Sequence, residues 1–332
     1  MNKHYIKLWL LIFAILTISI IILGGFTRLT GSGLSIVEWK PVVGSIPPLS
    51  ENQWLEEFEK YKSFPEYKKV NYGINLNEFK FIFLTEYLHR LLARSLGLFF
   101  IIPFLFFAYK KAIKNYPPYL LILMLGMTQG FAGWYMVKSG LINEPHVCHY
   151  RLGLHLMLAF FIYSLTVSLL FDEENKINNI KAKSTSSLSS LCSSLYLLLV
   201  LVYVQIFFGA LVAGLKAGLI YNTFPMMGDG ILPDEIDTYA KLLDLNTPAI
   251  VQFWHRTFAY SIFVLAFFIS LKLYKNKQKK EGGILISSIT LQFLLGILTL
   301  LYSVPLELGL LHQLGGIVFI TSVIYVIKKQ PS

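Results

Sequence analysis

The chain has little charge and almost no cysteine. Only 14% of its 332 residues are charged, and cysteine occurs twice, at Cys148 and Cys192. Soluble domains carry about 25% charged residues, so an ordinary soluble protein is excluded. The two cysteines fall at opposite ends of predicted helices, and no disulfide is predicted between them. Cys148 lies near His146 and His149, a weak metal-ligand pattern for which an unpaired loop cysteine is the preferred interpretation.

Long apolar runs dominate what remains. Apolar residues make up 55% of the chain, and the mean hydropathy is +0.59. Lipid offers the backbone no water partner, so such runs cross a membrane as helices. We predict an all-α membrane protein with eight transmembrane helices, at 8–26, 80–108, 118–137, 150–171, 195–214, 249–271, 284–302 and 308–327.

Lysines gather in alternate connecting segments and at both ends of the chain. Examples are Lys3, Lys110, Lys181, Lys275 and Lys328. The positive-inside rule then predicts cytoplasmic termini, and the net charge of +10 reflects topology rather than nucleic-acid binding. The first apolar run is too long for a signal sequence and lacks a small-x-small cleavage site. There is no Ser/Arg-rich presequence, so a bacterial inner membrane is the predicted location.

The two halves of the chain resemble each other. We predict two pseudo-symmetric four-helix bundles, residues 1–172 and 195–332, joined by a cytoplasmic linker at 173–194. Four helices per unit means that both units cross the membrane in the same sense. Glycines such as Gly126, Gly130 and Gly133, or Gly209 and Gly214, let helices approach closely, and each of them singly is interpreted as a packing position. The matched positions are Gly24 with Gly209, Glu86 with Gln252, His89 with His255, Gln129 with Gln292, Gly133 with Gly296, and His155 with His312.

A long outer loop at 27–79 separates the first two spans. Ser50 with Gln53 forms a capping-box signal, and Trp54, Phe58 and Tyr61 follow at helical spacing. The pattern predicts a short amphipathic helix on the outer surface. Its aromatic side chains either cover a site in the first bundle or anchor the loop to the membrane interface.

Four histidines fall in the outer halves of apolar helices: His89, His155, His255 and His312. Ionisable groups are costly within a membrane and usually have a function there. Hydrogen-bonded core histidines or proton relays are the alternatives to metal ligands. Duplication at matched depth on alternate helices favours metal ligands.

Each half offers two imidazoles on separate helices between apolar walls. Zinc requires more ligands than this, whereas a haem iron takes one imidazole on each face. Each bundle is therefore predicted to hold one haem. Arg90 and Arg256 follow their histidines directly. Pairing with haem propionates and snorkelling to the interface are equally compatible with their positions.

The halves differ at one chemically important position, where the first has Glu86 and the second Gln252. A buried carboxylate can move protons or stabilise positive charge, and an amide cannot. This difference predicts a reactive first site and an electron-carrying second site. The alternative interpretation of Glu86 is an ion pair with Arg90, one helical turn away.

The chain resembles the haem A synthase family along nearly its whole length, in the branch without a cysteine pair in the first outer loop. The resemblance is carried by 25–35 (GFTRLTGSGLS) with Glu38-Trp39, 86–90 (EYLHR), 129–134 (QGFAGW), 151–155 (RLGLH), 222–225 (NTFP), 253–256 (FWHR) and 311–316 (LHQLGG).

That resemblance implies an oxidoreductase. His255 and His312 would ligate a resident haem B, while His89 and His155 would surround the substrate haem O, with Glu86 essential beside it. A porphyrin methyl group of haem O would be oxidised twice, through a hydroxymethyl stage, to the formyl group of haem A. Glu86 would stabilise a carbocation or steer water. A haem O synthase is the expected neighbour, and the oxygen source, electron partner and oligomeric state stay open.

Two other functions compete with this reading. A di-haem electron-transfer cytochrome would gain nothing from Glu86 standing where the repeat has Gln252. A transporter with histidine proton relays should have helices broken near mid-span. Pro103, toward the inner end of its helix, is the main candidate for such a break.

Overall fold

The computed structural model describes residues 3–38, 46–141, 145–177, 189–236 and 239–330. Within these residues eight helices are long and apolar enough to cross a membrane, and no named strand occurs, which confirms the predicted all-α class. Each begins and ends within several residues of its predicted span. They are α1 (Lys3–Leu29), α4 (Leu76–Tyr109), α5 (Pro117–Gly140), α6 (His149–Ile177), α7 (Ser189–Gly214), α8 (Pro248–Lys275), α9 (Lys279–Leu301) and α10 (Leu306–Lys329).

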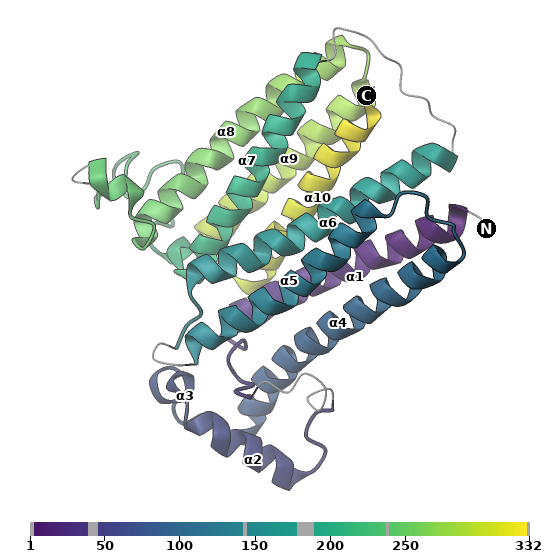
Figure 1. Ribbon diagram of the computed structural model, residues 1–332. Helices are drawn as coiled ribbons and strands as arrows, with labels where there is room; N and C mark the ends of the chain where they lie inside the picture. The colour runs from purple at the N-terminus through teal and green to yellow at the C-terminus, as the bar shows by residue number, and fades with distance from the viewer. Residues whose placement is uncertain (1–2, 39–45, 142–144, 178–188, 237–238, 331–332) are drawn as a thin grey trace.

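The helices form two neighbouring sets of four, each closed on itself like a ring (Figure 1). These two sets of helices are called the first ring and the second ring below. In the first ring α1 contacts α4 and α6, and α5 packs against both of those. In the second, α7 contacts α8 and α10, and α9 packs against both. The rings meet through α1 with α10, α6 with α7, and α6 with α10. Exchanging the two rings maps the first of these contacts onto the second, an arrangement consistent with the predicted duplication.

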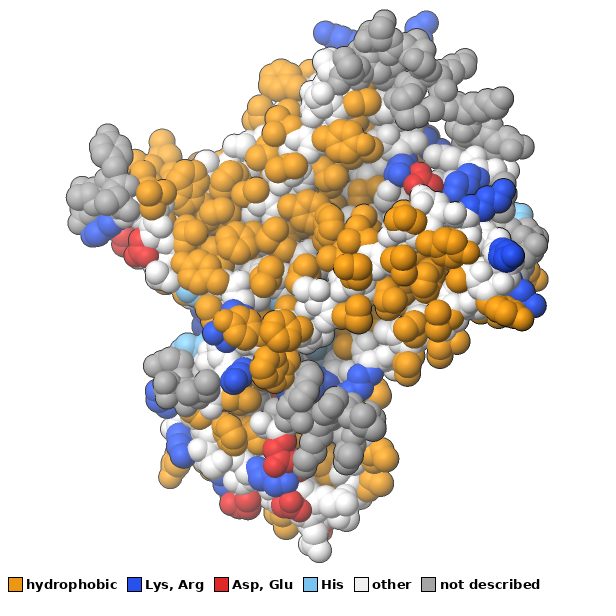
Figure 2. Space-filling view, in the orientation of Figure 1, with side chains coloured by type: hydrophobic (Ala, Val, Ile, Leu, Met, Phe, Trp, Pro, Cys, Tyr) orange, Lys and Arg blue, Asp and Glu red, His pale blue; other side chains and the backbone are white. Residues whose placement is uncertain are grey.

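Apolar side chains fill the seam between the rings and also coat the outside. Phe160 of α6, Leu198 of α7 and Ile320 of α10 are buried in one continuous core. On the visible face, hydrophobic side chains cover the helices, and charged side chains gather towards their ends (Figure 2). Met127 is 64% exposed and Phe268 61%. Such exposure is expected where lipid replaces water as the solvent.

The loop after α1 carries the predicted amphipathic helix, α2 (Glu51–Lys62), with α3 (Pro65–Lys69) behind it. The Ser50–Gln53 capping box is present. Phe58 stacks on Phe79 with ring centroids 4.9 Å apart, and Tyr61 is fully buried. The aromatic stripe of α2 therefore packs on the first turns of α4, which extend beyond the other helices of the ring (Figure 1). This end of the molecule, opposite both chain termini, is called the loop end below.

Two details of the helices bear on the sequence predictions. Pro103 lies inside α4, which continues to Tyr109 without interruption. Gly126 and Gly130 of α5 do not pack against another helix, because a Cβ atom added to either would meet nothing within 4 Å. The packing interpretation was wrong for these two, since glycine spacing alone does not say which helix face is covered.

Candidate functional site

The four histidines lie on alternate helices toward the loop end. His89 is on α4, His155 on α6, His255 on α8 and His312 on α10. Three of these helices begin within about two turns of their histidine, and α4 begins earlier because its first turns support α2. The structure thus brings the predicted residues to a common depth. His4 lies at the opposite end, and His149 opens α6.

Each histidine ring lies against a glycine of the preceding long helix. A Cβ atom on that glycine would approach the ring closely, so any larger residue would displace it. The distances from such an atom are 3.3 Å at Gly24 to His89, 3.0 Å at Gly133 to His155, 3.2 Å at Gly209 to His255, and 3.0 Å at Gly296 to His312. The four rings therefore occupy equivalent positions, which explains why these glycines matched between the two halves.

In the second ring the two imidazoles face each other. The ring centroids of His255 and His312 are 6.5 Å apart, at an interplanar angle of 76°. A histidine nitrogen binds a transition metal at about 2 Å, so two imidazoles on one ion have centroids a little over ~6 Å apart. The Nδ1 atoms of both residues are buried without a hydrogen-bond partner. Unpaired buried nitrogens at this separation fit an iron with one imidazole on each face.

The first ring repeats this pair less symmetrically. His155 and His89 are near enough to interact electrostatically, and Nδ1 of His155 is also buried without a partner. Within the part of the chain that the structure describes, no three His, Cys, Asp or Glu side chains gather as a metal site would require. Two imidazoles per ring suit a haem better than a zinc ion, which takes three or four protein ligands.

Glu86 is 3% exposed and held on all sides. One carboxylate oxygen, Oε1, pairs with Arg90 Nη2. The other, Oε2, accepts hydrogen bonds from Ser35 N at 2.8 Å, Ser35 Oγ at 2.7 Å and Ile36 N at 3.0 Å. The ion pair proposed as the alternative interpretation of Glu86 is thus present. It belongs to a larger network that fastens the loop after α1 to α4, one turn from His89.

The second ring has the same scaffold with the polarity reversed. Arg90 donates to the main-chain oxygen of Ile36 at 3.1 Å, and Arg256 donates to that of Tyr221 at 2.7 Å. Gln252 Nε2 donates to this same Tyr221 oxygen at 3.0 Å, whereas Glu86 accepts from main-chain N–H groups. The first ring therefore holds a buried anion where the second holds a neutral amide donor.

Both arginines have protein partners. Arg256 Nη1 also donates to the main-chain oxygens of Thr223 and Met226, at 2.9 and 3.1 Å, while its Nε is buried without a partner. Arg94, one turn beyond Arg90 on α4, likewise has a buried Nη1 without a partner. Propionate binding by Arg90 and Arg256 stays a prediction. Arg94 is a third arginine, with a free donor close to the same site.

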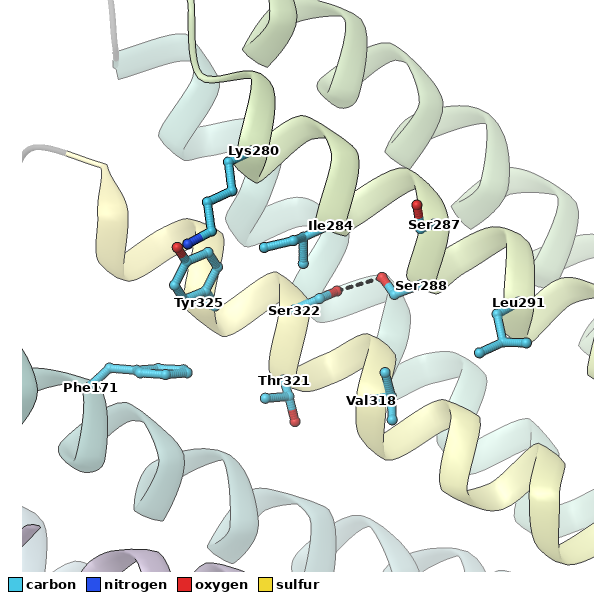
Figure 3. Close-up of a pocket in the computed structure, with 10 residues that line it drawn as sticks. All are labelled: Phe171, Lys280, Ile284, Ser287, Ser288, Leu291, Val318, Thr321, Ser322 and Tyr325. Carbon is cyan, nitrogen blue, oxygen red and sulfur yellow. Dashed lines mark hydrogen bonds between the residues drawn. The ribbon is translucent and has the colours of Figure 1, made fainter.

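A separate cavity of about 540 Å³ opens between α6, α9 and α10 near the chain termini (Figure 3). Its lining is mainly apolar, with Lys280 and Tyr325 at its edge and a 2.7 Å hydrogen bond between Ser288 and Ser322. It lies at the opposite end of the helices from the histidines and contains none of the predicted site residues.

Sequence reasoning gave no role to several residues that hold the site together: it matched Gln129 with Gln292 without assigning them a function, and it missed Gln205. Gln129 Nε2 lies 3.3 Å from His155 Nε2, and Gln205 Nε2 lies 3.3 Å from His255 Nε2. Ser35 was part of a matched string but was given no role. The signal for the glutamines was available, because Gln-x-x-x-Gly recurs before three of the four histidines.

These features define a class: a multi-pass membrane protein with two pairs of histidines, in which each imidazole packs against a glycine of the preceding long helix. The comparisons give the family. Residues 7–324 match the model of the COX15-CtaA family, described as cytochrome oxidase assembly protein. The chain belongs to this family.

Named relatives are similar over nearly the full length. The heme A synthase of Rickettsia felis is 46% identical over 331 residues, covering 98% of each chain. Those of Rickettsia conorii and Rickettsia bellii are 47% and 48% identical over the same length and coverage.

Proposed function

We propose that this chain is an enzyme of haem A biosynthesis that oxidises haem O to haem A. The observation that carries the proposal is the exchange of Glu86 for Gln252 within otherwise matched sites. One site has a buried anion and the other does not, as expected if one haem is substrate and the other is cofactor. Membership of a family whose relatives are named heme A synthase supports the same function.

The second ring is the proposed cofactor half. His255 and His312 would hold haem B, one imidazole on each face, and Arg256 would bind a propionate with its unpaired Nε. When bound, haem B supplies one-electron transfer. Gln252 is neutral and places no negative charge beside that site.

The first ring is the proposed substrate half, with His89 and His155 on either side of haem O. Its methyl carbon passes through the hydroxymethyl to the formyl state and loses two electrons in each stage. The Glu86 carboxylate is fixed by four contacts and does not need to reorganise as charge develops. A preorganised anion of this kind stabilises a positive charge at the reacting carbon.

We place the enzyme in a bacterial inner membrane with both termini in the cytoplasm. This orientation follows from the lysines at the termini end and sets the histidines toward the periplasmic leaflet. A haem O synthase would supply the substrate. The two oxidations together remove four electrons from haem O, and these electrons need an acceptor outside the chain.

Haem extraction and chromatography test the function. Protein purified from cells with a haem O source should contain haem B with haem O or haem A, and a low-spin spectrum. Protein from cells without that source should contain haem B alone. Equal haem B at both sites under both conditions would identify a di-haem electron carrier instead.

A further inference from the structure

All four histidine rings pack against a glycine, but only three of these glycines have a glutamine one helical turn before them. Residues four apart share a helix face, so the residue one turn before each glycine also lies beside the ring. In three helices this residue is a glutamine, and in α1 it is Ile20. The pairs are Gln129 with Gly133, Gln205 with Gly209, Gln292 with Gly296, and Ile20 with Gly24.

Two of the glutamines contact the rings. The amide nitrogens of Gln129 and Gln205 each lie 3.3 Å from a ring nitrogen of their histidine. The side chain of Gln292 lies against α10, where a Cβ atom added to Gly315 would meet its Oε1 atom. The side-chain oxygens of all three glutamines are buried and have no hydrogen-bond partner. The amides of Gln129 and Gln205 present their NH₂ groups to the ring nitrogen, and a half-turn of the amide would present the unpaired oxygen as an acceptor for the ring N–H instead.

An acceptor in this place has a known effect on a metal ligand. Histidines that bind metals usually donate the other ring N–H to an oxygen, which fixes the ring and makes it a stronger ligand. Removing such a partner typically weakens metal binding by about 10-fold to 100-fold. The side chain of Ile20 offers His89 no acceptor, and both Glu86 oxygens are engaged by Arg90 and the loop after α1.

We propose that Ile20 makes His89 the weakly held ligand, so that the haem in the first ring exchanges while the haem in the second is retained. This inference rests on the proposed function, in which the first ring must admit haem O and release haem A. A resident cofactor, in contrast, must stay bound. The missing glutamine falls in the same half as Glu86, which agrees with a substrate site there. Ile20 is thus a positioning residue that acts through His89.

The test supplies the missing partner. Ile20→Gln should slow the loss of haem O and haem A from the purified holoprotein by about tenfold. The loss is measured by transfer to excess apomyoglobin, with chromatography identifying which haem has left. Ile20→Leu, which has no acceptor, is the matched control and should lose haem at the wild-type rate.

The reverse exchange provides a second variant. Gln205→Ile should speed the loss of haem B about tenfold and leave the haem O rate unchanged. Electron paramagnetic resonance of the ferric haems should register a changed ligand field only at the altered site, which a general loss of stability would not produce. Equal haem loss in Ile20→Gln and Ile20→Leu would overturn the proposal, as would full retention of haem B in Gln205→Ile.

The two proposals fail in different ways. If haem O is not a substrate, no haem A forms, yet the transfer rates still reveal whether the first site is the weaker one. If Ile20 has no such effect, haem A forms normally, and the substitutions leave the transfer rates of both haems at their wild-type values.

Discussion

At the residue scale, the chemistry depends on how a buried charge is held. Placing an unpaired carboxylate in a membrane protein is costly, but hydrogen bonds and an ion pair offset the cost. Glu86 has three hydrogen bonds at one oxygen and Arg90 at the other. Gln252 uses its neutral amide to hold the equivalent loop through Tyr221. Both residues fasten a loop to a helix, and only Glu86 places a negative charge beside its histidine.

The glycine seats predict a sharp difference between two substitutions in α5. Gly133→Ala places a methyl group 3.0 Å from Cε1 of His155, so the ring must shift. We expect an overpacking cost of about 1–3 kcal/mol and a marked loss of haem O, measured by haem extraction after purification. Gly130→Ala is the control, because nothing lies within 4 Å of its Cβ. Equal haem content in Gly133→Ala and Gly130→Ala would show that His155 does not depend on a glycine at position 133.

The ligands of the cofactor half predict a selective loss. His255→Ala removes one of two facing imidazoles, and we expect most haem B to be lost while the His89–His155 site still binds haem O. Quantifying each haem in the purified variant checks this. Wild-type haem B content in His255→Ala would show that other residues ligate haem B.

Sequence reasoning reached the histidines and the matching glycines, but not the contacts of the polar residues around them. Intramembrane histidines stand out because any ionisable group is rare there. The contacts of Ser35 with Glu86 join residues 51 positions apart, and no periodicity in the chain reports such a pair. Gln205 could have been recognised, because its spacing to Gly209 repeats that of Gln129 to Gly133, but the contact of its amide with His255 could not.

At the element scale, hydropathy predicted all eight spans because apolar length is what a bilayer requires. The α2 helix was predicted from its capping box and aromatic spacing, but its partner, the start of α4, was not. An amphipathic stripe predicts that one face of a helix is covered, but it does not predict which element covers that face. The structure also joins the two rings through Arg28, which donates to the last carbonyls of α7, Ala213 and Gly214, at 2.9 Å each.

The loop helices carry a pH-sensitive contact. Glu66 of α3 is buried and accepts a hydrogen bond from Tyr61, and burial raises the pKa of its carboxyl from 4.5 to about 7. The folded loop binds this proton more tightly than the unfolded chain does. Its contribution to stability is therefore fully present below the unfolded pKa and is lost as pH rises through about 7.

Hydrogen-exchange protection of α2 and α3 should accordingly fall as pH is raised through about 7, after correction for the intrinsic exchange rate. Glu66→Gln should remove most of this dependence, because the neutral amide stays uncharged. Glu59→Gln, at a side chain that is 67% exposed, should leave it in place. A Glu66→Gln loop with the wild-type pH profile would show that another group titrates.

At the scale of the whole molecule, the two native cysteines report the orientation. Cys148 precedes α6 at the loop end, and Cys192 lies in the first turn of α7 at the termini end. With cytoplasmic termini, a membrane-impermeant maleimide should label Cys148 in intact cells, and Cys192 only after permeabilisation. Cys148→Ser and Cys192→Ser assign the signals. Labelling of Cys192 in intact cells would reverse the orientation.

The duplicated scaffold gives one chain two matched pairs of histidines with unequal surroundings, which we propose to be two haem sites of unequal reactivity. Matched glycines and histidines provide the shared geometry, and a few unmatched residues, Glu86 and Ile20 among them, distinguish the halves. Copying a bundle is a simple way to place two cofactors side by side, since each ring already closes on itself.

The most direct test of this account is the haem content of Glu86→Gln purified from cells with a haem O source. The account predicts that the variant retains haem B and haem O and forms no haem A. Haem A at the wild-type level in Glu86→Gln would contradict the claim that one buried acid makes one site reactive.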